Sequence, residues 1–67
     1  MKAFSERLKQ LRAERKLSQR DVAKALGIDQ AGYARFELGG ETNFEMLVKI
    51  ATYFGVTPNY LLGVEDY

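Results

Sequence analysis

The chain has 67 residues, with ten lysines and arginines, nine aspartates and glutamates, no histidine or cysteine, and a formal net charge of +1. The lack of cysteine excludes disulfides, thiolate metal sites and cysteine nucleophiles, and it favours a reducing, intracellular location. No window is long and apolar enough for a secretory leader or a membrane span, so we expect a soluble cytoplasmic protein with one domain, residues 1–67.

Charge is distributed unevenly along the sequence. Residues 1–35 hold nine of the ten basic residues against four acidic ones, for +5, whereas residues 36–67 hold Lys49 against five acidic ones, for −4. This asymmetry fits a basic face that meets nucleic-acid phosphate. Charged helix surfaces that only keep the protein in solution explain it equally well.

A first helix is predicted over residues 3–15. Its apolar residues fall at i, i+4 and i+7 and form one stripe among charged side chains: Phe4, Leu8 and Leu11. Lys16 and Leu17 then link this helix to the next, and we expect Leu17 to be buried.

A second helix is predicted over residues 19–26. Ser18 and Asp21 have the spacing of a capping box at its start. Gly27 ends it, because glycine adopts the left-handed conformation of a helix C-terminus without steric cost.

A third helix, residues 30–38, follows after only two residues. Asp29 is expected to cap it through its side chain, and Ile28 to fill the angle between the two helices. Tyr33 and Phe36 supply its buried face. Its outer side carries small residues with one amide and one guanidinium, a surface suited to close contact with a flat or grooved partner: Gln30, Ala31, Gly32, Ala34 and Arg35.

A loop over residues 39–43 precedes a fourth helix, residues 43–54, in which Thr42 and Glu45 have capping-box spacing. The apolar face predicted for this helix consists of Phe44, Leu47, Ile50, Ala51 and Phe54.

A fifth, short helix is predicted over residues 58–62. Thr57 is placed to cap it, Pro58 suits the first helical position, and Gly63 ends it. The sequence has no strand pattern and no repeat. The fold class expected is therefore all-α, a compact five-helix bundle.

Residues spread over nearly the whole chain carry a resemblance to a known family. They are Leu17-Ser18-Gln19, Val22-Ala23, Leu26-Gly27, Tyr33, Phe36-Glu37, Ile50-Ala51, Phe54-Gly55-Val56 and Tyr60-Leu61-Leu62. In this pattern the chain resembles the Cro/CI-type (XRE-like) helix-turn-helix family, which includes the lambdoid phage repressors. The resemblance implies a lambda-repressor-like fold in which residues 30–38 enter the major groove of double-stranded DNA and residues 19–26 lie across its backbone.

The resemblance also implies which residues face base edges: Gln30, Ala31, Gly32 and Arg35. A glutamine pairs bidentately with adenine and an arginine with guanine, each worth about 1–3 kcal/mol of discrimination. Gly32 offers only close approach, and it weakens the helix by roughly 1 kcal/mol relative to alanine. The alternative is that all four are merely exposed helix residues.

Phosphate contacts are implied for a second set: Ser18, Gln19, Arg20, Arg12, Thr42 and Asn43. Gln19 matches the position at which a side-chain amide and a helix N-terminus bind a phosphate. Alternatively, Gln19 is an ordinary first-turn residue. Arg12 also matches the family's ion pair with Glu37, which together with Gly27, Tyr33 and Phe36 has a structural role.

Two features concern the C-terminal half. Glu41 stands in the loop where family members often carry basic residues, and a carboxylate there repels phosphate. The resemblance further implies a two-fold dimer contact through Pro58, Tyr60 and Leu61. Several apolar residues exceed what a small core needs: Tyr53, Tyr60, Leu61, Val64 and Tyr67. Core filling is the simpler explanation for Tyr60 and Leu61, and a stacked loose tail is the simpler explanation for Tyr67.

Catalysis is not expected, since the carboxylates are scattered and there is no histidine, cysteine or glycine-rich phosphate loop. No cofactor, metal or small-molecule ligand is expected either. The leading hypothesis is a bacterial or phage-type regulator, a repressor that binds an operator with two half-sites as a weak dimer. The alternative is a protein-interaction module of the same fold, an adaptor or antitoxin-like component.

Overall fold

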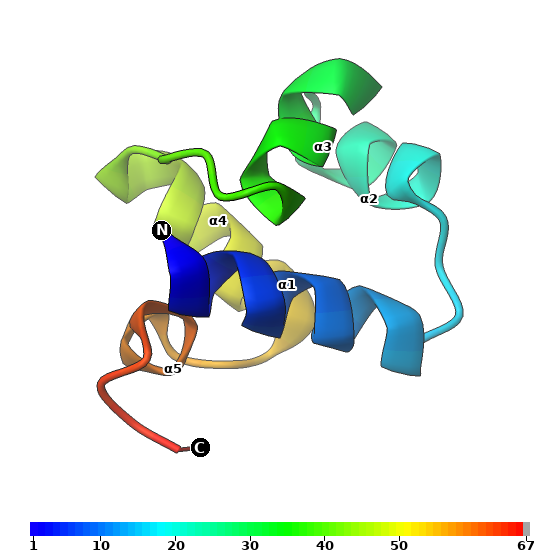
Figure 1. The fold of residues 1–67 in the computed structure, drawn as a ribbon. Coiled ribbons are helices and arrows are strands. Elements are labelled where there is room, and N and C mark those ends of the chain that lie inside the picture. Colours follow the sequence, from blue (N-terminus) through cyan, green and yellow to red (C-terminus); the bar gives the residue numbers. More distant parts are fainter. Residues whose placement is uncertain (67) are drawn as a thin grey trace.

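The structure, a computed structural model, describes residues 1–66. This part of the chain contains five helices and no strand, which confirms the predicted fold class (Figure 1). The helices are α1 (Lys2–Glu14), α2 (Gln19–Leu26), α3 (Gln30–Glu37), α4 (Phe44–Phe54) and α5 (Pro58–Leu62). In Figure 1, α2 and α3 lie on one side of α1, and α5 lies on the other. No helix within residues 1–66 has the length and apolar composition needed to cross a membrane.

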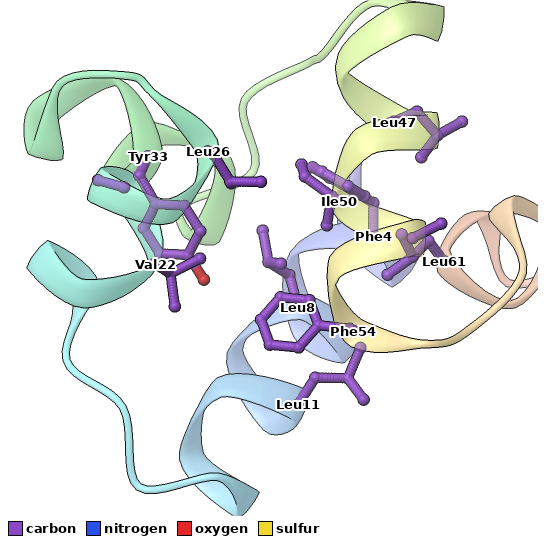
Figure 2. Close-up of a cluster of buried hydrophobic side chains, with 12 residues drawn as sticks. Phe4, Leu8, Leu11, Val22, Leu26, Tyr33, Leu47, Ile50, Phe54 and Leu61 are labelled. Carbon is purple, nitrogen blue, oxygen red and sulfur yellow. The ribbon is translucent and has the colours of Figure 1, made fainter.

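All five helices contribute side chains to one hydrophobic core, which Figure 2 shows. Its members are Phe4, Leu8, Leu11, Val22, Ala23, Leu26, Tyr33, Leu47, Ile50, Ala51, Phe54 and Leu61. Leu17, Ile28 and Phe36 are partly buried against it. Full burial of one large apolar side chain stabilises a fold by about 1.5–3 kcal/mol, so this core fixes the arrangement of the helices.

Most of the predicted helix ends are confirmed. Ser18 accepts a hydrogen bond from the backbone of Asp21, whose carboxylate accepts from the backbone of Ser18 in return. Thr57 caps α5 with Pro58 at its start. The three glycines that follow α2, α4 and α5 have positive φ, as the left-handed cap requires: Gly27, Gly55 and Gly63.

Two predicted caps are wrong. The side chain of Asn43, not Thr42, caps α4 by accepting from the backbone N–H of Met46 (2.8 Å). The chain is still extended at Asn43 and enters the helix one residue later than a Thr42 cap requires. Asp29 precedes α3 in an extended conformation, but its side chain forms no capping hydrogen bond.

Phe44 does not join the core, contrary to prediction, and is 76% exposed. Its helical phase places it on the apolar face. However, it is the first residue of α4 and lies nearly one turn before Leu47, the first buried residue of that helix. Periodicity gives the direction of a side chain, and it does not show where along the helix the core begins.

Three cations connect helices through backbone carbonyls. Arg7 donates to the carbonyls of Tyr60 (2.6 Å) and Glu65 and stacks on the Tyr60 ring. Arg15 donates to the carbonyl of Phe54 (2.7 Å) and Lys49 to that of Leu26 (2.8 Å). These contacts place positive charge at the C-terminal ends of α5, α4 and α2, where the helix dipole favours it.

Gly63 marks a close approach between α1 and the end of α5. A Cβ built at this position would lie 2.7 Å from the Cβ of Ala3. Such a separation is shorter than van der Waals contact, so the two segments meet only because residue 63 has no side chain.

Candidate nucleic-acid interface

The α2–α3 pair has the geometry of a helix-turn-helix. Gly27 adopts φ 74°, and the N–H of Ile28 donates to the carbonyl of Ala23 (3.0 Å), which closes the end of α2. Ile28 is half-buried against the core, and α3 begins two residues later. The turn therefore holds α3 at a fixed angle against α2.

The inner face of α3 is anchored by aromatic side chains. Tyr33 is fully buried, and Phe36 packs edge-on against both Phe4 and Tyr33, with ring centroids 5.9 and 6.4 Å away. The hydroxyl of Ser5 donates to the carbonyl of Phe36, which ties the end of α3 to α1. The structural roles predicted for Tyr33 and Phe36 agree with this packing.

The outer face of α3 is open to solvent. Gln30, Ala31 and Arg35 are exposed, and Gly32 is half-buried. Beside this face lies an open recess of about 650 Å³. It is lined by Gly27, Ile28, Asp29, Ala31, Gly32, Arg35 and Phe36. A surface of small side chains with one guanidinium permits close contact with the edge of a larger molecule.

A polar network beneath this face links α1, α2 and α3. Arg12 donates to both carboxylate oxygens of Glu37, from Nε (2.6 Å) and from Nη2 (2.9 Å), as predicted for this pair. Its third nitrogen donates to the carbonyl of Leu17 (2.9 Å). The amide of Gln19 donates to Glu37 as well (3.1 Å), a contact that the sequence did not predict. Glu37 of α3 is thus the shared acceptor of side chains from two other helices, α1 and α2.

The charge of Glu37 is stabilised despite its burial. Burial by itself raises the pKa of a carboxyl, but the neighbouring Arg12, Tyr33 and Gln19 together outweigh it, and the pKa of Glu37 lies below its ordinary value. The hydrogen bond to Glu37 likewise raises the pKa of Arg12. The hydroxyl of Tyr33 adjoins this pair without a hydrogen bond of good geometry. Burial raises its pKa, so it stays protonated.

The residues predicted to contact phosphate differ in availability. Ser18 and Arg20 are exposed at the start of α2, and Gln19 is half-buried beside them. Asn43 is exposed, although its side-chain oxygen is occupied by the cap of α4. The prediction is wrong for the Thr42 side chain, because its hydroxyl oxygen is buried without a partner and faces no solvent.

The predicted dimer contact also needs correction. Leu61 is 0% exposed and belongs to the core of its own chain, so it is not available to a partner. Pro58 and Tyr60 are half-buried. The apolar side chains that do reach the surface in this region are Tyr53, Leu62 and Val64. Tyr67 lies outside the described residues.

Sequence reasoning missed two features near α3. Asp29 lines the recess with a carboxylate that neither caps the helix nor forms an ion pair within residues 1–66. Leu38, which ends α3, is 82% exposed. The sequence did contain a signal for the exposure of Leu38. Gly39-Gly40 directly follows it, and a residue at a helix end beside two glycines has few neighbours. Residues 1–66 contain no cluster of three or more histidine, cysteine or acidic side chains that could hold a metal ion.

Comparison with known proteins agrees with this geometry. The helix-turn-helix family model HTH_3 matches residues 8–61. The uncharacterized HTH-type transcriptional regulator YqaE of Bacillus subtilis (strain 168) is 40% identical over 94% of this chain. The HTH-type transcriptional activator BcrR of Enterococcus faecalis is 36% identical over 94%, and the cryptic phage CTXphi transcriptional repressor RstR of Vibrio cholerae is 35% identical over 79%.

The matches cover 55% of YqaE, 31% of BcrR and 49% of RstR, so the chain spans about half or less of each of these relatives. No solved structure matches the chain with significance. The family match includes both helices of the turn and most of the bundle that supports them. The chain belongs to the XRE-like helix-turn-helix family.

Proposed function

We propose that this chain is the DNA-binding part of a transcriptional regulator, a repressor that acts in the cytoplasm on an operator with two half-sites. In this proposal α3 enters the major groove, with Gln30 and Arg35 at base edges and Ala31 and Gly32 allowing close approach. The observation that carries the proposal is the exposed outer face of α3 on a helix whose inner face is fully anchored.

Support also comes from the network at Glu37. A side chain that positions a duplex must be held in place before binding, because ordering it on binding costs free energy. Gln19 is held by Glu37, which is itself fixed by two hydrogen bonds from Arg12. Gln19, together with the exposed Ser18 and Arg20, then contacts backbone phosphate at the start of α2.

For the two half-sites, we propose a weak dimer on DNA. Two bound copies would place their α3 helices about one DNA turn, ~34 Å, apart. Because Leu61 is buried in its own chain, the contact between the two copies would use Pro58, Tyr60 and the exposed apolar residues Leu62 and Val64.

The test is in vitro selection of bound duplexes, followed by salt-titrated binding to selected and random sequences. The Arg35→Ala variant should lose preference at one base position, whereas Gln19→Ala should weaken binding to all sequences alike. Lys9→Ala is the matched control, since Lys9 is exposed on α1 outside the helix-turn-helix. Absence of saturable binding to any duplex at low salt would overturn the proposal.

A second candidate function is a protein-interaction module, and specific residues favour it. Leu38 and Phe44 are exposed on either side of the loop that contains Glu41. A surface that approaches phosphate usually carries cations there, not apolar side chains and a carboxylate. If no duplex binds, this candidate becomes the leading function.

A further inference from the structure

The carboxylate of Asp29 neither caps α3 nor joins an ion pair within residues 1–66. An aspartate directly before a helix usually accepts a hydrogen bond from one of the first backbone N–H groups. At Asp29 the backbone has the extended conformation of a cap, φ −67° and ψ 146°, yet that bond is absent. The side chain also forms no ion pair with any residue in the described part of the chain.

This carboxylate lies on the surface proposed to face DNA. Asp29 is exposed and lines the same recess as Ala31, Gly32 and Arg35. Among the residues that line this recess, Arg35 is the sole cationic one, and Ala31 and Gly32 present no polar side-chain atoms. An acidic group so close to a duplex weakens binding by repelling phosphate, unless it meets a hydrogen-bond donor.

Base edges in the major groove offer two such donors, the N4 amino group of cytosine and the N6 amino group of adenine. Adenine also presents the N7 acceptor beside its amino group, and a carboxylate has only acceptor oxygens. The second oxygen would therefore face N7 with no proton between them. Cytosine presents no acceptor in the major groove, so a carboxylate discriminates in its favour.

We propose that Asp29 is a specificity-determining residue that accepts a hydrogen bond from the N4 amino group of a cytosine in the operator. This inference rests on the proposed function. Asp29 and Arg35 are six residues apart, or about 9 Å along the helix axis. The cytosine therefore lies within about three base pairs of the position read by Arg35.

The test is parallel in vitro selection with the unmodified chain and the variants Asp29→Asn and Asp29→Ala. Asparagine supplies both an acceptor and a donor and so matches adenine at N6 and N7. Asp29→Asn should switch the preferred base from cytosine to adenine, and Asp29→Ala should abolish the preference. Direct titration of matched duplexes should show that the unmodified chain favours cytosine by about fivefold, the lower range for a base contact.

Glu41→Gln is the matched control, because it removes one carboxylate from the loop after α3 and not from the recess. It should strengthen binding to every duplex and leave the selected motif unchanged. Circular dichroism establishes that each variant is folded, which we expect since the Asp29 side chain forms no capping hydrogen bond and no ion pair within residues 1–66.

The outcomes separate this inference from the function on which it rests. If the cytosine of the selected motif changes in both Asp29 variants, the proposed role of Asp29 is supported. The same motif from all three proteins overturns the role of Asp29 while leaving DNA binding intact. Failure of the unmodified chain to select any motif overturns both.

Discussion

Lys16 has a backbone conformation that its side chain makes costly. It has φ 56°, the only positive φ outside glycine among the described residues. It follows the C-cap of α1, and its neighbour Leu17 donates to the carbonyl of Arg12 (3.2 Å), as in the helix ends where glycine is common. A residue with a Cβ loses about 1–2 kcal/mol in this region.

Lys16→Gly should therefore stabilise the domain by about 0.5–1 kcal/mol, the strain relieved less the extra entropy of glycine in the unfolded chain. Urea denaturation measures the change in the free energy of unfolding. Lys16→Ala is the control, because alanine removes the charge but retains the strain and should give no gain. Equal stability of the two variants would contradict the explanation.

Individual residues also show how far the sequence predicts the structure. Gly27 and Gly63 end helices as expected, because their conformational freedom acts locally and does not depend on distant packing. The choice between Thr42 and Asn43 as cap was not predictable in this way. Both side chains can cap a helix, and the path of the loop from α3 decides which one lies at the first turn.

At the scale of elements, the Arg12–Glu37 pair holds α3 to α1, and the bond from Gln19 adds α2. The side chain of Glu37 is 2% exposed and that of Arg12 is 20% exposed. Breaking a buried pair by neutralising one member typically costs 3–5 kcal/mol, and the partial exposure of Arg12 reduces this. The network is therefore important both for stability and for the position of Gln19.

Glu37→Gln should lower the free energy of unfolding by about 2–3 kcal/mol at neutral pH. The pKa of Glu37 is lowered in the folded state. The contribution of its charge to stability is therefore complete above the unfolded pKa of 4.5 and is lost as the pH falls through the folded pKa. The variant should thus differ most from the unmodified chain above pH 4.5, and the difference should shrink in acid.

Thermal denaturation from neutral pH to acid tests this expectation. Glu14→Gln serves as the control, since Glu14 is an exposed carboxylate at the end of α1. A difference in stability between Glu37→Gln and the unmodified chain that stays constant across pH would show that the charge of Glu37 is not responsible.

The pair was predictable only through the family resemblance, because no local pattern links residues that are 25 positions apart. The bond between Gln19 and Glu37 was not predicted at all. It depends on the angle at which α2 meets α3, and that angle results from the packing of Ile28 and the core. Likewise, the burial of Leu61 depends on where α5 lies against α1 and α4.

At the scale of the whole molecule, internal contacts reduce the positive charge available to the proposed DNA interface. Four of the ten basic residues bind groups within the fold: Arg7, Arg12, Arg15 and Lys49. At most six cations therefore remain to neutralise phosphate without breaking an internal contact. The asymmetry of charge in the sequence overstates the basic character of the binding surface for this reason.

Binding should consequently depend only moderately on salt. Each neutralised phosphate contributes about −0.9 to the slope of log K against log salt concentration, so the slope per bound domain should be no steeper than roughly −5. Anisotropy titrations of a half-site duplex between low and physiological salt measure it. A steeper slope would mean that residues engaged within the fold, such as Arg15, release their carbonyls and bind phosphate.

The close approach of Ala3 and Gly63 makes these two positions dependent on each other. A side chain at position 63 meets the Cβ of Ala3, so part of its cost disappears only when residue 3 is itself glycine. The remaining cost comes from the positive φ at Gly63 and does not depend on residue 3. In relatives that share this packing, residues 3 and 63 should therefore vary together rather than independently.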